Sequence, residues 1–259
     1  MTDGLRVVID GPVATLTLDR PEALNALTVA VKVALRDELE RIAVDRAVRV
    51  VILTGAGRAF CAGQDLAERA LPDAVPLDVE LRERYNPIIQ ALRSMGQPVI
   101  AAVNGVAAGA GASLAFACDL RIAADDARFI FAFGRIGLVP DSGATWFLPR
   151  LVGAARAAEM ALVGDPIGAE EALRIGLVSR VVPGEQLMAQ ARELADRIAA
   201  GAPMAQALTK AALERAATID LDTALDGEAK LQGIAGASAD HAEGLAAFRE
   251  KRAPRFTGE

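Results

Sequence analysis

The chain has 259 residues, of which 53% are hydrophobic, so it can bury an extensive core in one large domain or in a domain with a small appendage. Its formal net charge of −6 argues against nucleic acid as a partner, because a polyanion needs a basic surface. Two widely separated cysteines, a single histidine (His241) and the lack of any run of about eighteen uncharged apolar residues predict a cytoplasmic protein without a disulfide framework, a His-rich metal site or a membrane span.

Predicted strands crowd the first half of the chain. They cover residues 7–9, 13–18, 48–53, 99–103 and 120–122, with predicted helices at 28–45 and 78–94 between them. Thr28 can cap the first of these helices. The run from Val50 to Leu53 lacks polar alternation, as expected for a strand covered on both faces. The pattern predicts an α/β fold with a sheet buried by helices, and residues 70–77, which include two prolines, are the predicted mobile loop.

Only helices are predicted after about Gly184. They cover residues 185–200, 203–217, 221–232 and 238–251, separated by residues 201–203 and 233–237. We therefore divide the chain into residues 1–183, which form the core, and residues 184–259, which form an appended helical region.

Three short segments carry the features of a catalytic site. Residues 58–66 and 104–113 each follow an apolar strand and contain small residues, so their backbone N–H groups are accessible to a ligand. Residues 139–143 contain one carboxylate, Asp141. Backbone amides that face a carboxylate suit a reaction in which negative charge develops on a carbonyl oxygen. The segments together predict an oxyanion hole facing one acid/base.

Two other classes of enzyme fit these segments poorly. A dinucleotide-binding fingerprint requires glycine or alanine three positions after Gly111, where this chain has Leu114, and no phosphate-binding Gly-Lys-Ser/Thr loop occurs. A serine hydrolase would need Ser113 or Ser142 to work with His241, but neither serine lies in a Gly-x-Ser-x-Gly turn.

In their order and spacing, the three segments resemble the crotonase superfamily of enoyl-CoA hydratases and isomerases. The likeness extends from Leu18-Asp19-Arg20-Pro21 to Phe248-Arg249-Glu250-Lys251-Arg252. It implies a spiral of ββα units with an appended C-terminal α-helical region. It also implies that this region packs on the core and supplies subunit contacts in a homo-oligomer, either a trimer or a dimer of trimers.

The resemblance also implies roles for individual residues. The N–H groups of Ala62 and Ala110 would form the oxyanion hole, with Ala110 at the start of a helix whose dipole adds positive potential. Coenzyme A would be part of the substrate, and no separate cofactor is implied. Asp65 is better interpreted as a loop-fixing hydrogen-bond acceptor than as a catalyst. The residues that the resemblance places along the acyl-CoA path are Ala23, Leu24, Gln64, Asp65, Leu66, Gly109, Phe248 and Lys251, the last two at the adenosine end and often on a neighbouring subunit.

The two glutamates of the superfamily's hydratases fall on Ser113 and Phe133 in this chain. Neither residue can act as a carboxylate. Adding water across a double bond uses that pair, whereas a single base can move a proton between two carbons. The likeness is greatest to the phenylacetate-pathway isomerases that act on ring-1,2-epoxyphenylacetyl-CoA, in which an aspartate at the position of Asp141 is the acid/base. The alternative role of Asp141 in this chain is to cap the helix that follows it.

The sequence therefore predicts a cofactor-free acyl-CoA isomerase that works through a thioester enolate. Its expected reactions are isomerisation of ring-1,2-epoxyphenylacetyl-CoA and a shift of a Δ3 double bond to Δ2. Two alternatives stay open: an enoyl-CoA hydratase, and a non-catalytic subunit that binds acyl-CoA.

Overall fold

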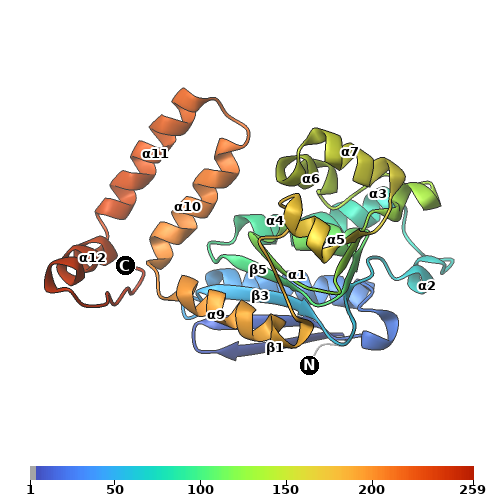
Figure 1. The fold of residues 1–259 in the computed structure, drawn as a ribbon, viewed down its shortest axis with the longest axis horizontal. Helices are drawn as coiled ribbons and strands as arrows, with labels where there is room; N and C mark the ends of the chain where they lie inside the picture. The colour runs from blue at the N-terminus through green and yellow to red at the C-terminus, as the bar shows by residue number, and fades with distance from the viewer. Residues whose placement is uncertain (1–3) are drawn as a thin grey trace.

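The computed structural model describes residues 4–259, and its core is built from two sheets (Figure 1). The larger sheet has the strand order β1-β2-β3-β5-β7-β10. Only β1 and β2 pair antiparallel; the other neighbours are parallel. The strands are β1 (Leu5–Asp10), β2 (Val13–Leu18), β3 (Val50–Gly55), β5 (Val99–Val103), β7 (Leu120–Ala124) and β10 (Arg180–Val182).

A smaller sheet continues three strands of the larger one. Its order is β4-β6-β8-β9, with bounds Ala59–Cys61, Val106–Ala108, Arg128–Ile130 and Ile167–Gly168. A few residues after β3, β5 and β7 end, the chain enters β4, β6 and β8 respectively. Because β4 and β6 pair in parallel, the segments that leave their carboxyl ends start side by side. This repeated strand–strand unit is the predicted spiral, and it brings two of the three candidate segments together.

Helices cover the larger sheet on both faces, as predicted. All residues of β3 and β5 are buried. One face is covered by α9 (Leu187–Ala199), which contacts β2, β3, β5 and β7. The remaining helices of the core are α1 (Val29–Val44), α2 (Leu66–Arg69), α3 (Leu77–Glu80), α4 (Asn86–Ser94), α5 (Ala110–Ala117), α6 (Ala144–Val152), α7 (Ala154–Val163) and α8 (Ala169–Arg174). Thr28 caps α1, as predicted, by accepting a hydrogen bond from the N–H of Val31 at 3.2 Å.

The single helix predicted for residues 78–94 is interrupted. A π-helical turn, Leu81–Tyr85, joins α3 to α4, and the N–H of Asn86 bonds to the carbonyl of Leu81, five residues back. Pro87 follows directly and has no N–H to donate. Single π turns inside α-helices are often found at functional sites.

The C-terminal helices form an arm that extends from the core, at the left of Figure 1. It consists of α10 (Pro203–Ala216), α11 (Leu221–Gly236) and α12 (Ala239–Glu250). The predicted break at residues 233–237 is wrong, because α11 continues through Gly233 to Gly236; a helical glycine costs only about 1 kcal/mol relative to alanine. Residues 4–259 include no helix that is long and apolar enough to cross a membrane.

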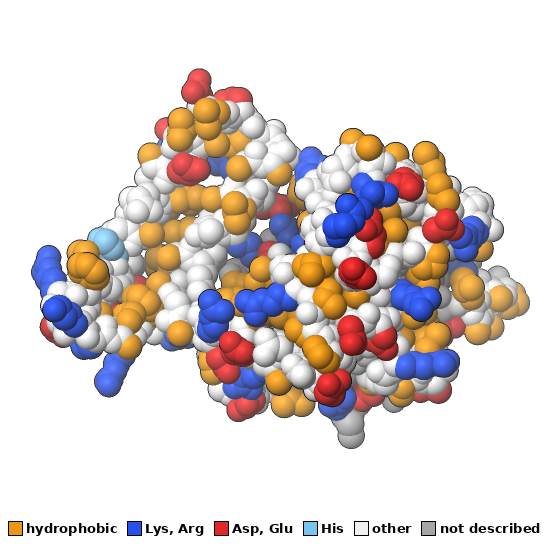
Figure 2. All heavy atoms as spheres, in the orientation of Figure 1, with side chains coloured by type: hydrophobic (Ala, Val, Ile, Leu, Met, Phe, Trp, Pro, Cys, Tyr) orange, Lys and Arg blue, Asp and Glu red, His pale blue; other side chains and the backbone are white. Residues whose placement is uncertain are grey.

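The C-terminal helical region packs on the core of this chain in part. The helix α9 does so, and α10 is fastened where Lys210 Nζ lies 2.7 Å from the carbonyl oxygen of Leu92 and 2.8 Å from Asp119 Oδ2. The helices α11 and α12 lie beyond this attachment (Figure 1). Figure 2 shows hydrophobic side chains along the arm. Its exposed large apolar side chains include Leu213, Leu221, Leu225, Ile234 and Phe248.

Candidate active site

The segments that follow β4 and β6 meet at Gly63 and Ala110. A Cβ atom added to Gly63, whose φ is +90°, would lie 2.8 Å from the carbonyl oxygen of Ala108 and 3.3 Å from the nitrogen of Ala110. Ala110 is the first residue of α5, so its N–H has no intrahelical acceptor and lies at the positive end of the helix dipole. Gly109 precedes it with φ +52° and donates its own N–H to Ile130.

The prediction that the Ala62 N–H forms half of the oxyanion hole is wrong. That N–H donates to the carbonyl oxygen of Leu24 at 2.9 Å, so it is already used inside the protein. The N–H of Asp65 is likewise occupied, by the carbonyl of Leu27. Between them, the backbone N–H of Gln64 has no acceptor among residues 4–259. The free amide next to Ala110 is therefore that of Gln64.

The early loop holds this segment in place. Arg20 Nη1 bonds Asp65 Oδ2 at 2.8 Å, and Asn25 Nδ2 donates to the carbonyl of Ala59 at 2.7 Å. Asp65 also accepts the N–H groups of Ala67 and Glu68 and so caps α2, which begins at the exposed Leu66. The hydrogen bond and charge of Arg20 lower the pKa of Asp65. The interpretation of Asp65 as a loop-fixing acceptor is confirmed. Ala23 ends the short 3₁₀ turn Pro21–Ala23 that leads to Leu24.

Asp141 does not cap the helix that follows it. The N-cap position of α6 is Gly143, and no side chain bonds to the first turn of this helix. The carboxylate instead accepts a hydrogen bond from Ser142 Oγ at 2.9 Å. Burial raises the pKa of Asp141, and the Ser142 hydroxyl partly opposes this shift. The capping alternative is therefore excluded, and a half-buried carboxyl group is left available for chemistry.

The two positions that the resemblance aligns with the hydratase glutamates lie beside Asp141 and beside Gly109. Ser113 Oγ donates to the backbone carbonyl of Asp141 at 3.0 Å, which ties α5 to the Asp141 loop. Phe133 is buried, and its ring tip would lie 3.7 Å from a Cβ atom on Gly109.

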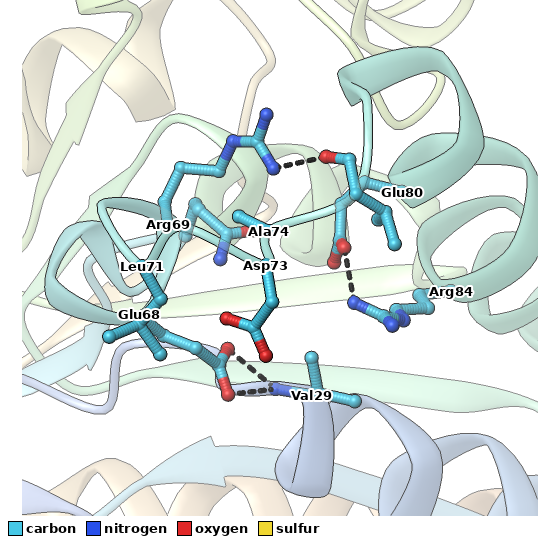
Figure 3. Close-up of a pocket in the computed structure, with 10 residues that line it drawn as sticks. Val29, Glu68, Arg69, Leu71, Asp73, Ala74, Glu80 and Arg84 are labelled. Atoms are coloured by element: carbon cyan, nitrogen blue, oxygen red, sulfur yellow. Dashed lines mark hydrogen bonds and ion pairs between the residues drawn. The ribbon is translucent and has the colours of Figure 1, made fainter.

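Sequence reasoning missed a group of charged and polar side chains behind Gln64. Gln64 Oε1 accepts hydrogen bonds from Tyr85 Oη at 2.8 Å and from Lys32 Nζ at 3.1 Å. Lys32 is fully buried and pairs with Glu80, which also binds Arg84. Figure 3 shows Glu80 and Arg84 at the wall of an adjoining cavity of about 170 Å³, which Gln64 also lines. No local sequence pattern indicates this group, because its members come from α1, α3 and the π turn, and Gln64 comes from the loop after β4.

The remaining predicted residues lie elsewhere. Phe248 and Lys251 are at the end of α12, both exposed, at the opposite end of the molecule from α2 (Figure 1). One chain therefore does not bring them to Gln64. Cys61 is buried and burial raises its pKa to about 12, so it packs in the core and is not a nucleophile. Among residues 4–259, no cluster of histidine, cysteine or acidic side chains has the arrangement of a metal site.

The fold defines the class of the protein, and the chain belongs to the enoyl-CoA hydratase/isomerase family, whose sequence profile matches residues 9–259. It is 49% identical over 254 residues to a probable enoyl-CoA hydratase of Rhodobacter capsulatus, with 98% of each chain covered. It is 45% identical to the 1,2-epoxyphenylacetyl-CoA isomerase of Escherichia coli K12, with 97% of each covered. The crystal structure of an enoyl-CoA hydratase from Bacillus anthracis, 38% identical, superposes with a TM-score of 0.96 over 99% of this chain and 100% of that one. These matches confirm the crotonase fold.

Proposed function

We propose that this protein is an acyl-CoA isomerase in which the backbone N–H groups of Gln64 and Ala110 stabilise a thioester enolate and Asp141 moves the proton. The observation that carries the proposal is the single carboxyl group: Asp141 is half-buried with a raised pKa, while Ser113 and Phe133 occupy the positions of the hydratase glutamates. Coenzyme A is part of the substrate, and the proposal uses no other cofactor.

The mechanism needs one base and two amides. The Asp141 carboxylate takes a proton from the carbon next to the thioester, and the electron pair moves onto the carbonyl oxygen. The Gln64 and Ala110 amides bond to that oxygen as its charge grows, and one such donor contributes about 3–4 kcal/mol to the transition state. The same carboxyl group then returns the proton further along the conjugated chain, at C4 of a cis-3-enoyl thioester. No water is added.

The proposed substrate is ring-1,2-epoxyphenylacetyl-CoA, with the Δ3 to Δ2 shift of an enoyl-CoA as a related reaction. The 45% identity with the E. coli isomerase supports this choice. The second candidate is enoyl-CoA hydration, because the relative at 49% identity carries that description. We further propose a homo-oligomer in which Phe248 and Lys251 of a neighbouring copy meet the adenosine end of the substrate, since both lie on the exposed arm.

The test is to compare three substrates with the purified protein: the ring-epoxide thioester, a cis-3-enoyl-CoA and crotonyl-CoA. We expect conversion of the first two into isomers of unchanged mass, with kcat/KM in the enzymatic range of about 10⁴–10⁸ M⁻¹s⁻¹ for at least one. Rapid gain of one water by crotonyl-CoA would instead establish a hydratase. Tight binding of all three without turnover would establish a non-catalytic acyl-CoA-binding protein.

A pH profile of the Ser142→Ala variant tests the role of the Asp141 carboxylate. The Ser142 hydroxyl lowers the pKa of Asp141, so its removal raises that pKa further above the ordinary value. Since the ionised form takes the proton, the rising acid limb of kcat/KM against pH is expected to move to higher pH. Ser179→Ala removes a serine hydrogen bond to the Arg121 backbone carbonyl instead; it is the control and should leave the limb in place. An unchanged limb in Ser142→Ala would contradict the assignment.

A further inference from the structure

Three buried side chains, Lys32, Glu80 and Tyr85, lie behind Gln64, and the mechanism does not use them. Lys32 has no exposed surface, and Glu80 and Tyr85 are 3% and 4% exposed. The Lys32 ammonium group pairs with Glu80, bonds to Gln64 Oε1 at 3.1 Å and lies 4.7 Å from the centre of the Tyr85 ring. Lys32 and Tyr85 therefore converge on a single amide oxygen, and Glu80 holds the Lys32 ammonium group.

The π turn creates this convergence. Glu80 ends α3 and Tyr85 ends the turn, five residues later. In an α-helix, positions five apart are separated by about 140° around the axis, so the two side chains would point in different directions. The wider π turn, with bonds between residues five apart, brings them to one face. Both then reach the Lys32 side chain on α1.

An ion pair buried in this way is weak evidence of stabilisation, because removing both charges from water costs about as much as their attraction returns. Burial lowers the pKa of Lys32, and Glu80 opposes that shift. Burial, with the nearby charge of Asp141 as a further cause, raises the pKa of Tyr85 well above its ordinary value, so its hydroxyl stays protonated and can donate. The group thus presents two hydrogen-bond donors, Lys32 Nζ and Tyr85 Oη, to Gln64 Oε1.

The backbone N–H of Gln64 belongs to the peptide that follows Gly63, a residue with φ +90°. The carbonyl of this peptide accepts the Leu27 N–H at 2.7 Å, and the Gln64 side chain adds a second attachment beside it. The side-chain amide of Gln64 is held at both ends: Oε1 accepts from Lys32 and Tyr85, and Nε2 donates to the Asp65 carbonyl at 3.2 Å. Fixing the side chain limits rotation of the adjoining peptide.

We propose that Lys32, Glu80 and Tyr85 are positioning residues that hold Gln64 so that its backbone N–H stays directed at the thioester oxygen. This inference rests on the proposed function, which makes that N–H an oxyanion donor. These residues act through Gln64 and do not themselves touch the reacting atoms. Their loss should therefore weaken polarisation of the bound carbonyl and lower kcat more than it changes KM.

The experiment records the carbonyl stretching frequency of bound butyryl-CoA labelled with ¹³C at the thioester carbon. This saturated thioester cannot isomerise, so the measurement does not depend on turnover. Wild-type protein is expected to lower the frequency relative to free butyryl-CoA. Tyr85→Phe removes one hydroxyl group, and Lys32→Met removes the charge at similar length. Both should move the frequency back toward the free value and lower kcat for cis-3-enoyl-CoA by about 10–100-fold, with little change in KM.

Lys210→Met is the matched control. Lys210 is also buried against a carboxylate, but it joins α10 to the core and does not contact Gln64. The Lys210→Met variant should leave the carbonyl stretching frequency and kcat unchanged. A Gln64→Leu variant completes a double-mutant cycle. In this variant the side chain at position 64 cannot accept the Tyr85 hydrogen bond, so adding Tyr85→Phe should cause no further loss of kcat.

The outcomes separate the two proposals. No frequency shift in the wild type would contradict the oxyanion hole and hence the proposed function. A wild-type shift that Tyr85→Phe retains in full would overturn the positioning role alone. Additive losses in the Gln64→Leu, Tyr85→Phe double variant would also overturn it. If Lys32→Met does not fold, Tyr85→Phe still tests the positioning role, because it deletes a single oxygen atom and leaves the rest of the side chain in place.

Discussion

Asp141→Asn is expected to lower kcat for isomerisation by about 10²–10⁴-fold, the usual contribution of a general acid–base group. The amide has nearly the shape of the carboxyl group and can still accept the Ser142 hydrogen bond, but it cannot take a proton from carbon. Kinetics with cis-3-enoyl-CoA check this result. The exposed Asp126→Asn variant is the control and should keep full activity.

The same variant should not be less stable at pH 7. Burial raises the pKa of Asp141 in the folded protein, so folding favours its protonated form. The stability contributed by such a group is complete below its unfolded pKa and is lost as the pH rises through its folded pKa. At neutral pH the ionised carboxylate therefore opposes folding, and asparagine relieves this cost. Urea unfolding should give an equal or higher midpoint. Full turnover in a normally folded Asp141→Asn protein would contradict its catalytic role.

Gly63→Ala has the second large expected effect. Its Cβ atom would lie 2.8 Å from the Ala108 carbonyl oxygen and 3.3 Å from the Ala110 nitrogen, so the two segments would have to separate. Displacing one oxyanion donor lowers kcat by about 10²–10³-fold. The left-handed backbone, φ +90°, adds strain of order 1–3 kcal/mol, which urea unfolding would detect.

Gly11→Ala separates these two effects. Gly11 also has positive φ, +58°, but an added Cβ atom meets nothing within 4 Å. This variant should lose stability from backbone strain and keep its kcat. If Gly63→Ala retained wild-type kcat, the close approach of the two segments would not matter for catalysis.

The meeting of residues 58–66 with residues 104–113 could be predicted from sequence, because each of these two segments follows a strand that the hydrophobic pattern identifies. The parallel pairing of β4 and β6 then brings residues 62–64 and 109–111 together. The identity of the free amide could not be predicted. The Ala62 N–H donates to the carbonyl of Leu24, and this contact depends on a loop that lies far from Ala62 in the sequence.

Other features depended on contacts that no local pattern encodes. A Pro-Asp-Ser-Gly sequence fits a helix cap as well as it fits a catalytic loop, and only the start of α6 at Ala144 excludes the cap. The π turn is similar: residues 78–94 have a continuous helical pattern, and the insertion is visible only in the Asn86 to Leu81 hydrogen bond. The buried ion pair between Lys32 and Glu80 was not predicted, because a lysine within an amphipathic helix normally lies on the solvent-facing side of that helix.

The most direct test of one-carboxylate chemistry follows a label. Cis-3-enoyl-CoA carrying deuterium at C2 is converted in ordinary water, and the product is examined by mass spectrometry and NMR. If Asp141 takes the C2 deuteron and returns it from its half-buried position, part of the label appears at C4 of an isomer that has gained no water. Complete loss of the transferred label to solvent, or a product heavier by one water, would contradict the account.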